Sequence, residues 1–180
     1  MATHQGKKIV FERRKTTEDD IKVILKEIRE FSRNELFVVA ETEEEALRQA
    51  VQGSRDVWSG FANNKLVLMY GVRLISIISN HAYLWMITTT LAEKHWVTFI
   101  RASTLFTYEL LHQYDKVSVI SPLKSHTSQK WLKYIGFQQE GTVRMHGVKF
   151  KTYSITKDAL KDEKLNWLKG EKGWQPLLAS

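Results

Sequence analysis

The fold predicted for this chain depends most on residues 125–137, SHTSQKWLKYIGF. The stretch carries apolar residues at helical spacing and then a glycine, the residue type that commonly ends a helix. The inward-facing residues are Trp131, Leu132 and Ile135, and the glycine is Gly136. Residues 116–121, rich in valine and isoleucine, predict a buried strand before this helix. Residues 137–145 and 148–155 predict two strands after it, paired across a turn at His146 and Gly147.

The preceding part of the chain predicts two helices with recognisable starts. Thr17 stands before three acidic residues, and apolar residues then recur at helical spacing. Thr42 is followed by three glutamates in a capping-box pattern, and Gly53 is placed to end that helix. Residues 93–112 show a long helical period and predict one continuous helix.

Strands are predicted between these helices. We expect a tight turn at Asn63 and Asn64, because asparagine tolerates a positive φ. The expected strands and extended pieces are residues 8–13, 37–40, 57–62, 65–75 and 83–88. The full order is β, α, α, β, β, β, α, β, α, β, β.

This order predicts an α/β chain of the mixed α+β kind, with a central twisted mixed sheet of about six to seven strands and helices on both faces. One domain accounts for residues 1–156. Residues 157–180 predict a C-terminal extension, with a helix at 157–169 and a tail that carries Trp174. We expect this extension to dock onto the domain or onto a partner.

Composition excludes several classes of protein. The 180 residues are 43% hydrophobic and 26% charged, which excludes a disordered or low-complexity chain. The absence of cysteine excludes disulfides, thiolate zinc sites and cysteine nucleophiles. No apolar run approaches the roughly 18 residues of a membrane-spanning helix. Residues 1–8 lack the apolar segment of a secretory signal, so we expect a cytoplasmic protein.

The net charge of +7 and the pI near 9.5 favour association with anions such as nucleic acid, coenzyme phosphates or an acidic protein. The basic residues do not form the continuous stripe that is typical of a nucleic-acid interface. No nucleotide-phosphate loop or serine-hydrolase elbow is present. The six histidines never stand in i, i+4 pairs, so we expect no metal site.

Residues 125–137 resemble the last helix of the GNAT (Gcn5-related N-acetyltransferase) superfamily, N-x-x-A-x-x-x-Y-x-x-x-G-F. Residues 140–147 and 152–155 are similar to its closing hairpin. A narrower resemblance is to the small GNAT-like proteins of tailed bacteriophages, which include an internal virion protein of T7-like podoviruses. It is carried by residues 44–47, Ser54, 57–58, 69–72 and 84–88. Together the resemblance spans roughly residues 8–156.

The resemblance implies a sheet that splays after its fourth strand and binds acetyl-CoA in the gap. In the superfamily the pantetheine arm pairs with exposed strand backbone, and the pyrophosphate sits at the start of the following long helix. The amide groups of residues 86–88 are expected to polarise the thioester carbonyl. The implied cofactor-binding residues are Met86, Ile87, Thr88, Thr89, Lys94, His95 and Ser125.

The chain departs from the superfamily pattern at two places. The positions of the phosphate-loop motif R/Q-x-x-G-x-G/A fall at Ala92, His95 and Val97, so no glycine permits close approach to a phosphate. The tyrosine that often protonates the departing thiolate falls at Leu132. Tyr134 is two residues on, about 200° round the helix, and is expected to face elsewhere.

The base that removes a proton from the amine has three candidates: His81, Glu93 and His126. Water is the expected substitute for the missing acid. Each of these residues is also compatible with an ordinary surface role.

Three interpretations of function follow. The first is an acyl-CoA-dependent N-acyltransferase that acts on an amine. The second is a phage protein that has lost catalysis and works by protein contacts, in the virion or on host machinery. The third is nucleic-acid binding through the basic surface. The expected location is the host cytoplasm, with incorporation into the virion in the second case. All three interpretations depend on whether the strands diverge near Ile87 and Val119 and leave an open gap, or whether a side chain such as that of Trp96 fills this gap.

Overall fold

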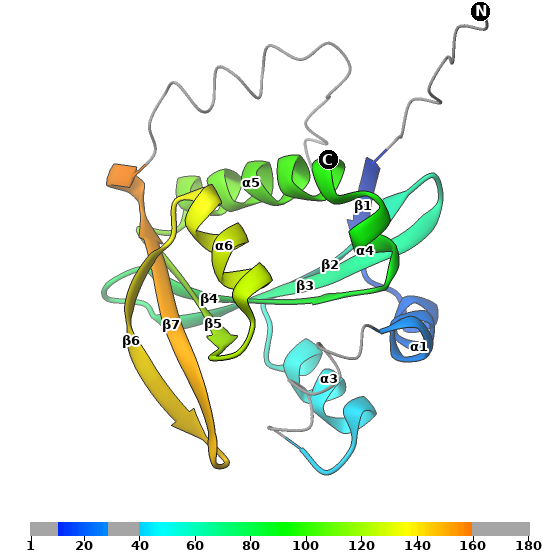
Figure 1. The fold of residues 1–180 in the computed structure, drawn as a ribbon, viewed down its shortest axis with the longest axis horizontal. Coiled ribbons are helices and arrows are strands. Elements are labelled where there is room, and N and C mark those ends of the chain that lie inside the picture. The colour runs from blue at the N-terminus through cyan, green and yellow to red at the C-terminus, as the bar shows by residue number, and fades with distance from the viewer. Residues whose placement is uncertain (1–10, 29–39, 160–180) are drawn as a thin grey trace, which may run out of the picture.

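A computed structural model describes residues 11–28 and 40–159 of the chain. Within these residues the strands form one mixed seven-stranded sheet, in the order β1-β2-β3-β4-β5-β7-β6 (Figure 1). The elements are β1 (Phe11–Lys15), α1 (Glu18–Glu27), α3 (Glu43–Gln52), β2 (Asp56–Ala62), β3 (Lys65–Ser76), β4 (His81–Thr88), α4 (Leu91–Lys94), α5 (Trp96–Gln113), β5 (Lys116–Pro122), α6 (His126–Ile135), β6 (Gln138–Met145) and β7 (Val148–Thr156). The predicted fold class is confirmed.

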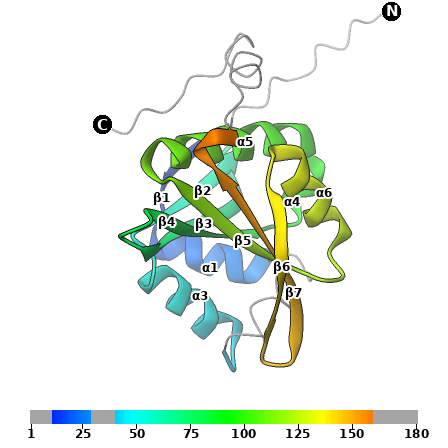
Figure 2. The same ribbon diagram turned by 90° about the vertical axis from the view of Figure 1, so that its left-hand side faces the viewer.

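Helices cover both faces of the sheet, as Figures 1 and 2 show. One core lies beneath α5 and α6, where Phe106 stacks on Tyr70 of β3 with 4.3 Å between ring centroids. A second, smaller core lies beneath α1 and α3, where Ile24 and Leu47 are fully buried with Met69 of β3. The sheet therefore has two buried faces.

Most predicted boundaries agree with the structure to within a few residues. Thr42 caps α3 by accepting a hydrogen bond from the Glu45 amide at 3.1 Å. Asn63 and Asn64 adopt positive φ angles of 49° and 62° in the β2–β3 turn. His146 and Gly147 do the same between β6 and β7. The turn chemistry of the sequence is therefore confirmed.

The prediction of one continuous helix over residues 93–112 is wrong. His95 has φ −115° and ψ 33°, outside the helical region, and separates the short α4 from α5. The apolar spacing predicts a short helix over residues 129–135, whereas helix α6 begins three residues earlier, at His126.

Several expectations lie wholly or partly outside the described residues. These are the first three residues of the predicted strand 8–13, most of the extended piece 37–40, and the extension beyond residue 159. Residues 157–159, within the described part, form a single 3-10 turn.

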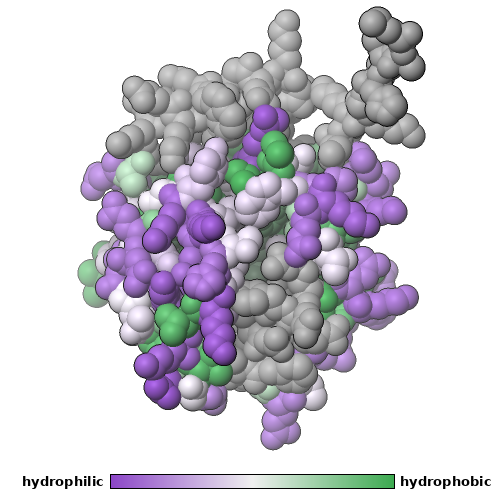
Figure 3. Space-filling view, viewed as in Figure 1, coloured by the Kyte–Doolittle hydropathy of each residue, from purple (hydrophilic) through white to green (hydrophobic). Residues whose placement is uncertain are grey.

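Among the described residues seen in Figure 3, polar side chains predominate and apolar side chains lie in small groups. The most exposed large apolar side chains are Ile77 and Ile78, in the turn between β3 and β4. No helix in the described residues is both long and apolar enough to cross a membrane.

Asp20 ties β1 to the start of α1. Its side chain is 6% exposed and accepts two hydrogen bonds from the Arg14 guanidinium, at 2.6 and 2.8 Å. The Thr17 amide donates a third at 2.9 Å. Burial acts to raise the pKa of Asp20, but the hydrogen bonds from Arg14 and Thr17 outweigh it and hold the pKa below its usual 3.8.

Replacing Asp20 with asparagine should therefore destabilise the protein in a pH-dependent way. A carboxyl with a depressed pKa contributes stability above its unfolded pKa, and this contribution is lost as the pH falls through the folded value. The difference in unfolding free energy between wild type and Asp20→Asn should be full above about pH 4 and shrink below it. Urea denaturation at several pH values measures this. The exposed Asp19→Asn is the matched control, and a pH-independent difference at Asp20 would contradict the assignment.

Candidate functional site

Strands β4 and β5 separate soon after they begin to pair. Their parallel register covers only His81–Lys116, Ala82–Val117 and Tyr83–Ser118. Beyond these pairs β4 continues beside β3 to Thr88, while β5 continues beside β7 to Pro122. The predicted divergence near Ile87 and Val119 is therefore confirmed.

The divergence leaves backbone polar groups of β4 without a strand partner. The Thr89 amide donates to the Val67 carbonyl of β3 at 2.8 Å. Because hydrogen-bonding direction alternates along an antiparallel strand, Ile87 also pairs with β3, whereas Met86 and Thr88 direct their N–H and C=O groups toward the gap. Two amide donors, not the three expected from residues 86–88, thus face the space between the strands.

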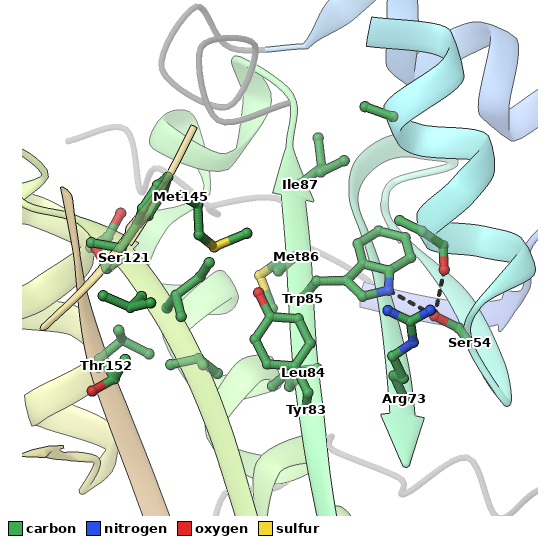
Figure 4. Close-up of a pocket in the computed structure, with 18 of the residues that line it drawn as sticks. Ser54, Arg73, Tyr83, Leu84, Trp85, Met86, Ile87, Ser121, Met145 and Thr152 are labelled. Atoms are coloured by element: carbon green, nitrogen blue, oxygen red, sulfur yellow. Dashed lines mark hydrogen bonds between the residues drawn. The ribbon is translucent and has the colours of Figure 1, made fainter. Parts of the chain in front are cut away.

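A cleft of about 640 Å³ occupies this gap and reaches both faces of the sheet (Figure 4). Helix α6 lines it on one face with Ser128, Trp131 and Leu132. Helix α3 lines it on the other, with Gln49 and Ala50. Residues of β4, β5 and the β6–β7 hairpin complete the walls. The cleft is therefore a passage through the sheet.

Two tryptophans are held as its walls. Trp85 donates from Nε1 to the Ser54 hydroxyl at 2.8 Å, and this hydroxyl donates to the Ala50 carbonyl at 2.7 Å (Figure 4). On the α6 side, Trp131 donates from Nε1 to the Ser103 hydroxyl at 3.0 Å. Trp96, the side chain considered as a plug, does not line the cleft, is 39% exposed and stacks on Phe99.

Further polar side chains line the cleft, among them those of Ser121, Tyr83, Arg73 and Thr152. Ser121 is 2% exposed, and its hydroxyl has no hydrogen-bond partner among the described residues. The ring of Tyr83 points into the space, and Arg73 lies at its edge (Figure 4). A buried hydroxyl without a partner is unusual in a folded protein, and at a cleft wall it marks a place where a ligand can bind.

The predicted cofactor-binding residues divide into two groups. Met86 and Ile87 line the cleft. Thr88, Thr89, Lys94, His95 and Ser125 lie outside its lining. Thr89 is fully buried, and its hydroxyl is directed at the Leu66 and Val67 carbonyls at 3.0 and 3.2 Å, so it holds the end of the sheet.

The residues predicted to meet the phosphates lie around the start of α5. Lys94 ends α4 and is exposed, and His95 precedes α5 with a buried Nδ1 that has no partner among the described residues. Ser125 is 5% exposed and caps α6, accepting a bond from the Gln129 amide on its carbonyl at 3.0 Å. A role for these residues toward a coenzyme stays a prediction.

None of the three candidate bases lines the cleft. His81 lies where β4 and β5 are still paired, with its Nε2 3.0 Å from the Ser118 hydroxyl. Burial, and secondarily Lys116, lower the pKa of His81 and favour the neutral imidazole. Glu93 on α4 and His126 at the first position of α6 are exposed. Their catalytic role stays a prediction.

The structure agrees with the predictions made from the sequence for Leu132 and Tyr134 of α6. Leu132 is 2% exposed and lines the cleft at the position where the superfamily carries tyrosine. Tyr134 is 57% exposed and lies outside the lining, so it does not replace that group. No cluster of three or more potential metal ligands is found among the described residues.

Sequence reasoning missed Arg73, Tyr83 and Ser121. The alternation of β4 could have placed Tyr83 on the same face as Trp85. The approach of α3 to the gap has no local signal, because it depends on residues distant in the chain.

No protein-family model matches the sequence. No curated protein matches it either. Solved structures do match. An aminoglycoside N(6')-acetyltransferase from Legionella pneumophila has a TM-score of 0.68 at 12% identity, covering 85% of this chain and 95% of that one. The aminoglycoside acetyltransferase AAC(6')-Ib, in complex with coenzyme A, has a TM-score of 0.65 at 11% identity, covering 86% and 99%.

A spermidine N-acetyltransferase from Vibrio cholerae, in complex with CoA and spermine, has a TM-score of 0.60 at 13% identity, covering 83% and 96%. The chain therefore has the fold of GNAT acetyltransferases, as the sequence resemblance predicted.

Proposed function

We propose that this chain is a GNAT-type N-acyltransferase that binds acetyl-CoA between β4 and β5 and transfers the acetyl group to an amine. The observation that carries the proposal is the open strand edge. Met86 directs its backbone N–H and C=O groups away from β3 into the cleft, where no strand among the described residues pairs with them, and such an edge can pair with the amides of a pantetheine arm. Structural neighbours that hold coenzyme A support this ligand.

The residues fit the arm of the coenzyme better than its phosphates. The cleft is lined on its α6 side mainly by apolar groups such as Trp131 and Leu132, and it ends where β4 meets β5 at Tyr83. At the start of α5, by contrast, His95 and Val97 stand where the superfamily carries small residues. Binding through the pantetheine arm, with weaker phosphate contacts, follows from this difference.

When bound, the coenzyme supplies a thioester as the acetyl donor. The Met86 amide is the donor that can stabilise negative charge on an acyl oxygen in the gap. Trp85 and Trp131 restrict water on the two sides. Because Leu132 cannot donate a proton, a thiolate leaves unprotonated or takes its proton from water.

A second candidate is a non-catalytic phage protein that uses this scaffold for protein contacts, in the virion or on host machinery. The resemblance to the small GNAT-like phage proteins motivates it. It is favoured by Leu132 and by the lack of a histidine or carboxylate among the described residues that line the cleft. Finding the chain in purified, nuclease-treated particles would support this candidate.

Acetyl-CoA should bind and stabilise the protein. A ligand at 100 times its dissociation constant adds about 2.7 kcal/mol to the free energy of unfolding, which gives a clear thermal shift. Calorimetric titration and thermal melting measure this. Ser128→Trp should obstruct the cleft from α6 and weaken binding, whereas the exposed Lys130→Trp on the same helix should not. No heat and no thermal shift at millimolar acetyl-CoA would eliminate the proposed function.

A further inference from the structure

On the side of α3, the charge that lines the cleft is positive. Of the described residues that line it, Arg73 is the one charged side chain, and none is a carboxylate. The remaining residues on this side are aromatic, apolar or neutral, among them Tyr83, Trp85 and Met145. A cationic ligand would therefore be repelled by a like charge there and find no carboxylate among the described lining residues to offset it.

The position of Arg73 is defined by its neighbours. In the β3–β4 register it stands directly opposite Tyr83, so the two side chains share the face toward α3. A Cβ atom added at Gly53 would come within 2.6 Å of the Arg73 guanidinium, which shows that the group lies against the end of α3. Figure 4 shows it beside Ser54 and below the Trp85 indole.

The guanidinium is available to a ligand. Arg73 is exposed, and no hydrogen bond or ion pair joins it to another described residue. Arg48 and Arg13, by contrast, are engaged in ion pairs: Arg48 binds Glu18 and Glu44 at 2.6 and 2.9 Å, and Arg13 binds Glu109 at 2.6 Å. A guanidinium presents parallel N–H donors that match the two oxygens of a carboxylate.

We propose that the acceptor is an amine that also carries a carboxylate and an apolar or aromatic group, with Arg73 binding the carboxylate. This inference rests on the proposed function and names its substrate class. The amine nitrogen forms a C–N bond to the acetyl carbon, the C–S bond breaks with its electron pair on sulfur, and the proton lost from nitrogen passes to water or to the thiolate. Polyamines, the ligands of one structural neighbour, are disfavoured by the same arginine.

The test compares two amines that differ only in the carboxylate. L-phenylalanine and phenethylamine are titrated calorimetrically into the full chain saturated with coenzyme A, and spermidine is titrated as a polycation. L-phenylalanine should bind at least about tenfold more tightly than either, the ratio expected for a charge-assisted pair. Arg73→Gln should remove this preference by weakening L-phenylalanine binding, whereas phenethylamine, a cation that Arg73 repels, should bind at least as well as to the wild type.

Arg144→Gln is the matched control, because Arg144 is an exposed arginine of β6 outside the cleft lining. It should keep the preference. If coenzyme A does not bind, the proposed function itself fails. If coenzyme A binds but L-phenylalanine shows no binding at millimolar concentration, or binds no better than phenethylamine or spermidine, the acceptor class alone is overturned. Loss of the preference in Arg144→Gln as well would also overturn the assignment to Arg73.

Discussion

Replacing Met86 with proline is expected to slow acetyl transfer by about 100-fold, the loss typical of removing one backbone donor from an acyl-oxygen site. The Met86 N–H faces the gap and makes no bond to β3, so proline removes this donor without removing a bond of the sheet. The measurement is the rate of thiol release from acetyl-CoA with a saturating amine, together with thermal melting to show that the variant is folded.

Two controls separate this effect from a loss of structure. Met86→Leu keeps the amide and most of the side-chain volume, and should retain nearly full activity. Ile87→Pro removes an N–H that pairs with β3, and should instead destabilise the sheet. A folded Met86→Pro protein with wild-type activity would show that the Met86 amide has no part in transfer.

Replacing Gly71 with alanine is expected to cost about 2 kcal/mol of unfolding free energy. A Cβ atom at Gly71 would lie 2.5 Å from three atoms of the Trp85 indole. The indole cannot simply rotate away, because its Nε1 is bound to Ser54 and its ring forms a wall of the cleft. Urea denaturation followed by circular dichroism measures the loss, and weaker acetyl-CoA binding should accompany it.

Combining Gly71→Ala with Trp85→Ala tests whether the loss of stability comes from a clash with the indole. In a Trp85→Ala background the clash is absent, so Gly71→Ala should cost little there. Gly141→Ala is the matched control in another strand, because its Cβ would lie 3.7 Å from the nearest atom, an ordinary contact. An equal loss at Gly71 with and without the indole would refute the steric explanation.

The fold was largely predictable because its signals are local. Thr42 and its glutamates mark a helix start, Asn63 and Asn64 mark a hairpin, and Gly136, at φ 122°, ends α6. Each depends on the conformational preference of a few adjacent residues. The break at His95 was not predictable in this way, since apolar periodicity continues through it and no glycine or proline marks the change.

The candidate site was predictable only in part. Met86 and Ile87 follow from the resemblance to the GNAT superfamily, which implies a coenzyme site at the fourth strand; the apolar pattern supplies only the position of that strand. Arg73 and Ser121 do not, because their place in the cleft depends on how α3 and the β6–β7 hairpin close over the sheet. The candidate bases show the same limit. His81 lies on β4, but at the end where β4 is still paired with β5 and not where the two strands diverge.

The open edge of β4 also bears on how the protein avoids aggregation. Unpaired strand edges commonly recruit strands from other molecules. Here that edge lies inside the sheet and lines the cleft between α6 and α3. The outermost strands, β1 and β6, are the accessible edges, and they carry charges such as Arg14 and Arg144. The protein thus keeps a strand edge with unpaired backbone groups for a ligand, while the two outer edges that neighbouring molecules can reach carry charged side chains that oppose aggregation.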